Sequence, residues 1–177
     1  MRVFVRRDRC LGCRTCELEC AVWRDSLARR LMGAATERPL PRPRLRVLAA
    51  PDGSPFPNHC RQCADAPCVL ACPSGALARR EGSAPAIVFR HELCLGCYSC
   101  VLACPFVAAR PDATGRFPLV CDACAGMDYA ACVDACPVRA LTRCEPADFD
   151  PADGYDPFGP HGPRPAGTTE GSDGSGD

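Results

Sequence analysis

A fourfold repeat of cysteines constrains this protein more than any other feature. Sixteen of its 17 cysteines fall into four quartets, each ending in a C-x3-C spacing. The quartets are Cys10, Cys13, Cys16 and Cys20; Cys60, Cys63, Cys68 and Cys72; Cys94, Cys97, Cys100 and Cys104; and Cys121, Cys124, Cys132 and Cys136. Three are followed directly by Pro73, Pro105 or Pro137, whereas Ala21 follows Cys20. Since an internal repeat indicates a repeated supersecondary unit, we expect one small unit to recur along the sequence.

The spacing within the quartets predicts iron–sulfur ligation. In C-x2-C-x2-C-x3-C-P, three thiolates surround one [4Fe–4S] cluster, and the fourth cysteine binds the other cluster of a pair. The second and fourth quartets widen the loop, with four residues between Cys63 and Cys68 and seven between Cys124 and Cys132, but keep four cysteines. Four complete quartets therefore predict four [4Fe–4S] clusters.

Two other uses of cysteine compete with this interpretation. Paired CxxC motifs also build zinc sites, and the fourth quartet considered by itself is compatible with zinc binding. Disulfides require an oxidising compartment, but no apolar signal segment follows residues 1–7 and no run reaches the ~18 apolar residues of a membrane span. We therefore expect a cytoplasmic, metal-bearing protein. Cys144 lies outside the repeat and is expected to be a spare thiol.

Composition and charge agree with bound clusters. Aromatic residues make up only 6% of the sequence, so clusters are expected to take over part of the role of a core. Residues 1–144 hold 20 arginines against 13 acidic residues, and 145–177 hold one arginine and eight acidic residues. A basic body can indicate nucleic-acid binding. However, each oxidised cluster with four thiolates carries about −2, so four clusters offset this excess and no nucleic acid is needed to explain it.

The segments between the cysteines predict short elements. Strands are expected at 2–5, 86–89 and 117–120, each ahead of a quartet. Residues 17–35 predict a helix with Leu18, Val22, Leu27 and Leu31 on one side, and a strand is expected at 44–48. Residues 145–177 are rich in Pro, Gly, Asp and Ser and predict a disordered tail.

Other residue types give no sign of substrate chemistry. His59 and His91 lie beside ligand cysteines, but sixteen thiols already complete four clusters, so hydrogen bonding near sulfur or surface exposure is expected. Trp23 is expected to pack against the first quartet's lobe rather than to conduct electrons. We find no GxGxxG, P-loop, flavin or Ser/His/Asp signature and expect no catalytic residue. The sequence predicts a carrier of electrons, not an enzyme.

Three motifs resemble a known family. They are CRQCADAPCVLACP at 60–73, CLGCYSCVLACPF at 94–106 and CDACAGMDYAACVDACP at 121–137. Over about residues 3–143 the sequence resembles the four-cluster ferredoxin-like subunits of molybdopterin oxidoreductases, formate hydrogenlyase and nickel carbon monoxide dehydrogenase systems. CELECAV at 16–22 and PRPRLRV at 41–47 are most similar to the carbon monoxide dehydrogenase-associated carrier, as are the short length and the absence of a membrane anchor.

The resemblance implies an α+β fold of tandem bacterial-type 2[4Fe–4S] ferredoxin-like lobes, one inserted in the other. Residues 1–30 and 112–144 would form the outer lobe, 31–55 a connector, 56–111 the inner lobe and 145–177 the tail. It also implies four ligand groups. Group one is Cys10, Cys13, Cys16 and Cys136; group two is Cys20, Cys121, Cys124 and Cys132; group three is Cys60, Cys63, Cys68 and Cys104; group four is Cys72, Cys94, Cys97 and Cys100.

The function implied is relay of single electrons from a carbon monoxide dehydrogenase to a hydrogenase or another reductase. The alternative within the same chemistry is the electron-transfer (beta-type) subunit of a molybdopterin oxidoreductase or a formate-linked hydrogenase. A zinc-stapled binding scaffold is the alternative of another class.

Overall fold

The computed structural model describes residues 2–80, 86–112, 114–145 and 148–149. Most of the segment expected to be a disordered tail lies outside these residues. Where its beginning is described, the ring of Phe149 stacks on that of Phe4, with centroids 4.2 Å apart. The first part of this segment therefore contacts the body of the protein.

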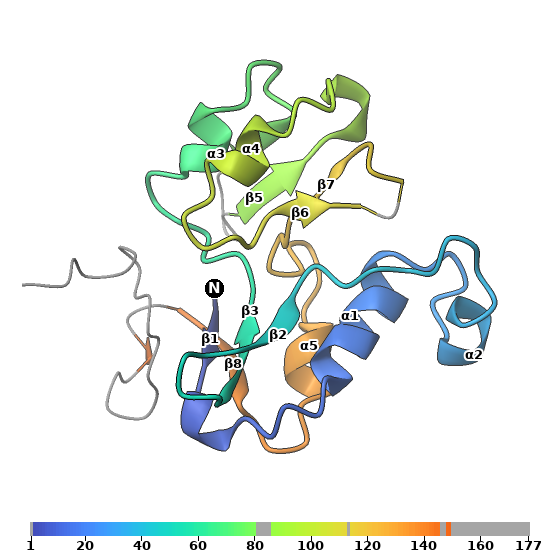
Figure 1. Cartoon of the computed structure of the whole chain (residues 1–177), viewed down its shortest axis with the longest axis vertical. Helices are drawn as coiled ribbons and strands as arrows, with labels where there is room; N and C mark the ends of the chain where they lie inside the picture. The colour runs from blue at the N-terminus through green and yellow to red at the C-terminus, as the bar shows by residue number, and fades with distance from the viewer. Residues whose placement is uncertain (1, 81–85, 113, 146–147, 150–177) are drawn as a thin grey trace, which may run out of the picture.

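All described strands pair in antiparallel two-stranded ladders. The pairs are β1 (Arg2–Val5) with β8 (Leu141–Cys144), β2 (Arg46–Ala49) with β3 (Pro55–Asn58), β4 (Leu77–Arg80) with β5 (Ala86–Phe89), and β6 (Arg110–Pro111) with β7 (Pro118–Leu119). The β1–β8 ladder joins the beginning of the sequence to the end of its cysteine-bearing part. Figure 1 shows this ladder beside β2 and β3 in one half of the molecule, with β5, β6 and β7 in the other.

Each quartet carries one short helix. The helices are α1 (Thr15–Arg24), α3 (Pro67–Leu70), α4 (Ser99–Leu102) and α5 (Ala131–Asp134); α2 (Leu31–Ala34) lies in the connector, and single 3-10 turns occur at Arg7–Arg9 and His91–Leu93. The helices α3, α4 and α5 end two residues before the last cysteine of their quartets. Since the residue before a proline is disfavoured in the helical region, the Cys-Pro pair limits these helices. Ala21 imposes no such limit, and α1 runs on past Cys20 to Arg24.

Two hydrophobic cores form, each around two quartets. The first contains Val3, Val5, Leu45, Val47, Ala130 and Leu141 together with Cys16, Cys20, Cys124 and Cys132. The second contains Ala66, Leu77, Ile87, Ala109 and Val120 together with Cys68 and Cys100, and Cys60, Cys72 and Cys104 pack against it. Quartets one and four thus share one core, and quartets two and three share the other. The structure is a small α+β fold of ferredoxin-like units.

The helix expected at 17–35 is confirmed only in part, because the backbone turns after α1 ends at Arg24 and becomes helical again only in α2. The carboxylate of Glu37 accepts hydrogen bonds from the Ser26 hydroxyl at 2.6 Å and from the backbone N–H groups of Leu27 and Ala28 at 3.3 and 3.0 Å. These bonds hold residues 26–28 in a loop that separates α1 from the single turn of α2.

The apolar side expected on that helix is wrong. Val22 is buried, but Leu18, Leu27 and Leu31 are 45%, 93% and 49% exposed. A helical stripe inferred across a turn has no common direction, so these leucines do not form one face.

Two strand predictions needed adjustment. The strand expected at 44–48 runs at Arg46–Ala49, and the one expected at 117–120 is reduced to Pro118–Leu119. The sequence did not indicate β3, because Pro55 and Pro57 argue against a strand. These prolines are tolerated because, among the described strands, β3 pairs only with β2 and its other edge carries no ladder. Within the described residues, no helix has both the length and the apolar character needed to cross a bilayer.

Candidate iron–sulfur centres

The first cysteine of each quartet lies in the same tight backbone turn. The residue two positions later has a left-handed conformation in all four quartets: Gly12, Gln62, Gly96 and Ala123, with φ of 68°, 53°, 69° and 53°. The N–H groups of Gln62, Gly96 and Ala123 donate to the sulfur of the first cysteine at 3.4–3.5 Å. Such N–H···S bonds stabilise thiolates and bound clusters. The sequence repeat is therefore also a repeat of local geometry.

The last cysteine of each quartet is also held by a backbone N–H. Leu77, Ala108 and Ala140, just after the Cys-Pro pair, donate to Cys72, Cys104 and Cys136 at 3.2–3.4 Å. Quartet one, which lacks the proline, differs. The sulfur of Cys20 accepts instead from the backbone N–H of Arg44 at 3.3 Å, so the connector supplies this bond.

Two cysteines at equivalent positions face solvent. Cys13 and Cys97 are exposed, and each sulfur lies 3.4 Å from a hydroxyl, that of Thr15 or Ser99. This hydroxyl contact is the main cause that lowers the pKa of each thiol. The loops of quartets one and three thus bring one cysteine sulfur each to the surface.

The other cysteines are buried or partly buried. Burial, augmented by neighbouring thiolates, raises the pKa of Cys16 and Cys60 to about 12 and that of Cys100 to about 11. The pKa values of Cys121 and Cys132 are also raised for these reasons. Such thiols stay protonated at neutral pH unless a cation compensates their charge, and metal coordination deprotonates a thiol outright. These buried thiols are therefore suited to binding a metal cluster, whose positive charge would compensate that of the thiolates.

The structure brings together all four cysteines expected for group one and all four expected for group two. One pocket is lined by Cys10, Cys13, Cys16 and Cys136, and another by Cys20, Cys121, Cys124 and Cys132. Each set combines three residues of one quartet with one residue of the distant quartet. The helices α1 and α5 pack together, and α1 carries one cysteine of each set.

In the second core, the electrostatic effects of cysteines on one another's pKa indicate which cysteines of quartets two and three lie close together. Besides burial, the charge of Cys104 raises the pKa values of Cys63 and Cys68, and it acts on Cys60 as well. Cys72 likewise acts on Cys97 and Cys100. Cys104 therefore lies near the first three cysteines of quartet two, and Cys72 lies near two cysteines of quartet three. Among the described residues, no three Cys, His, Asp or Glu side chains are arranged as ligands of a single metal ion.

The two histidines beside ligand cysteines behave differently. His59 is buried, with Nδ1 2.9 Å from the carbonyl oxygen of Cys60, and its ring lines the group-two pocket. Its Nε2 is a buried polar atom without a hydrogen-bond partner among the described residues. His91 is exposed and contacts the rings of Phe89 and Phe117 at 4.6 and 5.2 Å.

Trp23 packs as predicted, and Cys144 lies on a strand. The ring of Trp23 contacts the edge of Tyr129 with centroids 5.8 Å apart. Tyr129 lies in the loop of quartet four, so this contact joins the two quartets of the first core.

Cys144 lies at the end of β8, opposite Arg2.

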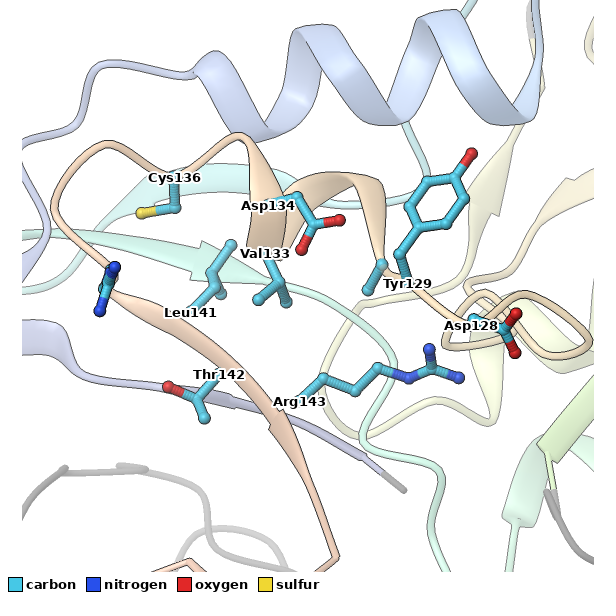
Figure 2. Close-up of a pocket in the computed structure, with 10 residues that line it drawn as sticks. Asp128, Tyr129, Val133, Asp134, Cys136, Leu141, Thr142 and Arg143 are labelled. Atoms are coloured by element: carbon cyan, nitrogen blue, oxygen red, sulfur yellow. The ribbon is translucent and has the colours of Figure 1, made fainter.

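An open pocket of about 590 Å³ lies between α5 and β8. Figure 2 shows Cys136 at one end of it and Asp128 and Arg143 at the other. Arg143 is held by its bond to the carbonyl oxygen of Met127 at 2.9 Å. This pocket is a solvent-facing hollow beside the last cysteine of quartet four rather than an enclosed cofactor cavity.

These cysteine groups in an α+β framework define an iron–sulfur protein of the ferredoxin-like class. Residues 52–145 match the family described as "4Fe-4S dicluster domain", and residues 7–23 match "4Fe-4S binding domain". The protein belongs to the 4Fe-4S dicluster family.

Its relatives are electron-transport proteins and subunits of oxidoreductases. An "Iron-sulfur protein" of Rhodospirillum rubrum is 37% identical over 78% of this sequence and 79% of its own. "Electron transport protein HydN" of Escherichia coli is 36% identical, covering 80% and 87%. A subunit of the anaerobic dimethyl sulfoxide reductase of Escherichia coli is 32% identical, covering 85% and 73%. One polypeptide of the BamBC complex of benzoyl coenzyme A reductase aligns with a TM-score of 0.42 at 22% identity, covering 79% and 76%. The protein is an iron–sulfur protein related to electron-transfer proteins and electron-transfer subunits.

Proposed function

We propose that this protein relays single electrons through four [4Fe–4S] clusters, one in each of groups one to four. The observation that carries the proposal is the gathering of complete four-cysteine sets in the group-one and group-two pockets. Bound clusters supply reversible one-electron redox chemistry. The protein's own residues supply thiolate ligands, N–H donors to sulfur and a buried environment that excludes water.

The two-lobe arrangement belongs to this proposal. An outer lobe of residues 1–30 and 112–144 would hold groups one and two, and an inserted lobe of 56–111 would hold groups three and four. The β1–β8 ladder and the two separate cores support this division. The connector, 31–55, contributes Leu45 and Val47 to the first core, so it also acts as part of the outer lobe.

The proximity of cysteines in successive groups, seen in their electrostatic influence on one another, supports a linear order of transfer. Electrostatic influence links Cys16 of group one to Cys132 of group two, Cys121 of group two to Cys60 of group three, and Cys68 of group three to Cys100 of group four. Exposed Cys13 and Cys97 belong to groups one and four. The relay therefore runs from one exposed end through two interior groups to the other exposed end.

For the partners, we propose a carbon monoxide dehydrogenase as donor and a hydrogenase or another reductase as acceptor, in the cytoplasm. The motifs CELECAV at 16–22 and PRPRLRV at 41–47 support this choice. The alternative is the electron-transfer subunit of a molybdopterin oxidoreductase or of a formate-linked hydrogenase. The similarity to a subunit of an anaerobic dimethyl sulfoxide reductase favours that alternative.

The proposed electron donor is tested by measuring which purified enzyme reduces this protein. The oxidised holo protein is mixed anaerobically with a catalytic amount of nickel carbon monoxide dehydrogenase and carbon monoxide, and bleaching of the visible cluster absorption is followed. A parallel reaction uses formate dehydrogenase and formate. We expect faster reduction in the first reaction, whereas reduction by formate alone would reject the proposed donor. If neither enzyme reduces the protein, although dithionite shows that its clusters are intact and reducible, both donors are rejected.

A further inference from the structure

A cluster of charged side chains surrounds group two, and it depends on the length of α1. Because Ala21 replaces the proline of the other quartets, α1 continues through Cys20 to Arg24. This extra turn places Arg24 among the residues that line the group-two pocket. Arg44, from the connector, lines the same pocket.

Asp122 fixes both arginines. One carboxylate oxygen of Asp122 accepts the backbone N–H of Cys124 at 3.1 Å. The other oxygen pairs with the guanidinium of Arg24 and with that of Arg44, the latter at 3.3 Å. The three side chains are only 15–21% exposed. The ion pairs therefore anchor two positive charges on a ligand loop of group two, in an environment where solvent screens them weakly.

The balance of charge at this site is positive. The charge of Arg44 acts on the thiolate of Cys20, and Arg110 and Cys20 also interact electrostatically. Arg110 is fixed there by its hydrogen bond to a carbonyl oxygen of the connector at 2.8 Å. The carboxylate of Glu17 acts on Arg110 as well, but it also lies beside Cys16 of group one. The group-two pocket itself is lined by two arginines, Arg24 and Arg44, and by one acid, Asp122, so the fixed charge of its lining is positive.

We propose that Arg24 and Arg44, held by Asp122, raise the reduction potential of the cluster in group two above the value that it would have without them. This inference rests on the proposed function. One electron from a donor changes the cluster and its four thiolates from about −2 to about −3, with no bond made or broken. Positive charge fixed nearby stabilises the more negative, reduced form. Asp122 opposes this effect by its charge while positioning the two arginines.

Redox titration of charge variants tests the inference on the full holo protein. Arg24→Gln and Arg44→Gln each remove one positive charge while leaving the side chain with an amide donor. Arg30→Gln, at an exposed position beside α2, makes the same change in net charge away from the quartets. Each variant is titrated anaerobically with dithionite and mediators, and the cluster signals are followed by electron paramagnetic resonance. The group-two signal is identified as the one that Cys124→Ser alters.

We expect Arg24→Gln and Arg44→Gln to shift the midpoint of the group-two signal downward, with the other midpoints unchanged and full iron content. Arg30→Gln should move none of these midpoints.

If both variants keep all clusters and their group-two midpoint matches that of Arg30→Gln, the inference is wrong although the proposed function stands. A shift confined to the signal that Cys13→Ser alters would also overturn it. Absence of cubane signals in the unmodified protein would instead reject the proposed function. Should Arg24→Gln lose iron, Arg44→Gln alone decides, and Arg44→Lys should then restore the potential by restoring the charge.

Discussion

Val5 and Leu141 lie opposite each other in the β1–β8 ladder, although they stand near opposite ends of the described sequence. Both side chains are almost fully buried, at 0% and 2% exposed. β1 leads into quartet one and β8 follows quartet four, so this pair fixes the two quartets next to each other. The gathering of groups one and two depends on this non-local contact.

Truncation of Leu141 should test how much the ladder contributes. Leu141→Ala should lower the free energy of unfolding by about 2–5 kcal/mol, because it removes a buried side chain and leaves a cavity. The matched control is Leu27→Ala, whose side chain is 93% exposed and whose loss should cost less than about 0.5 kcal/mol. Anaerobic denaturant titration of the holo proteins measures both. Equal effects of the two changes would argue against the first core as a source of stability.

Cluster content provides the most direct check on the cofactor. Anaerobically purified protein should contain about 16 iron atoms and as much acid-labile sulfide per polypeptide, corresponding to four cubane clusters. Iron and sulfide assays measure this, and Cys144→Ser should leave both values unchanged because Cys144 lies outside the quartets. About eight iron atoms at full occupancy would restrict clusters to one lobe, and stoichiometric zinc would refute the iron–sulfur interpretation.

The sharing of ligands between distant quartets can be tested by serine substitutions. Cys136→Ser should damage the same cluster as Cys13→Ser, because Cys136 and Cys13 line one pocket. Cys132→Ser should instead resemble Cys20→Ser, because Cys132 and Cys20 line the other pocket. Electron paramagnetic resonance of the reduced proteins distinguishes the signals. If Cys132→Ser and Cys136→Ser altered one and the same cluster, quartet four would bind locally and the two-lobe relay would have to be abandoned.

Removal of the clusters should unfold the protein. The described cores contain few large apolar side chains apart from cysteine, so metal binding is expected to supply much of the folding free energy. Prolonged chelation under oxygen should therefore abolish the cooperative thermal transition seen by circular dichroism in the holo protein. An apo protein that keeps a sharp transition and a native-like spectrum would show that the polypeptide folds without its cofactor.

The local parts of the site were predictable from the sequence because their geometry is set within a few residues. The turn after the first cysteine of each quartet places a left-handed residue and its N–H at the sulfur, as at Gly96 and Cys94. Cys-Pro pairs likewise limit α3, α4 and α5. These short-range effects explain why the spacing alone indicated the kind of cofactor, and why the strands β1 and β5 were located correctly.

Only the tertiary structure decided what depends on contacts between remote segments. The pairing of Val5 with Leu141 brings together quartets that spacing leaves unpaired. Glu37 holds the loop after α1 by hydrogen bonds to Ser26 and Ala28, and a search for helical periodicity does not reveal such bonds. Likewise, Arg24 and Arg44 meet at Asp122 only after the polypeptide has folded. Spacing determines how thiolates can surround a cluster, because it acts over single turns of backbone. Which turns meet, and which charges surround them, is determined by packing across the whole protein.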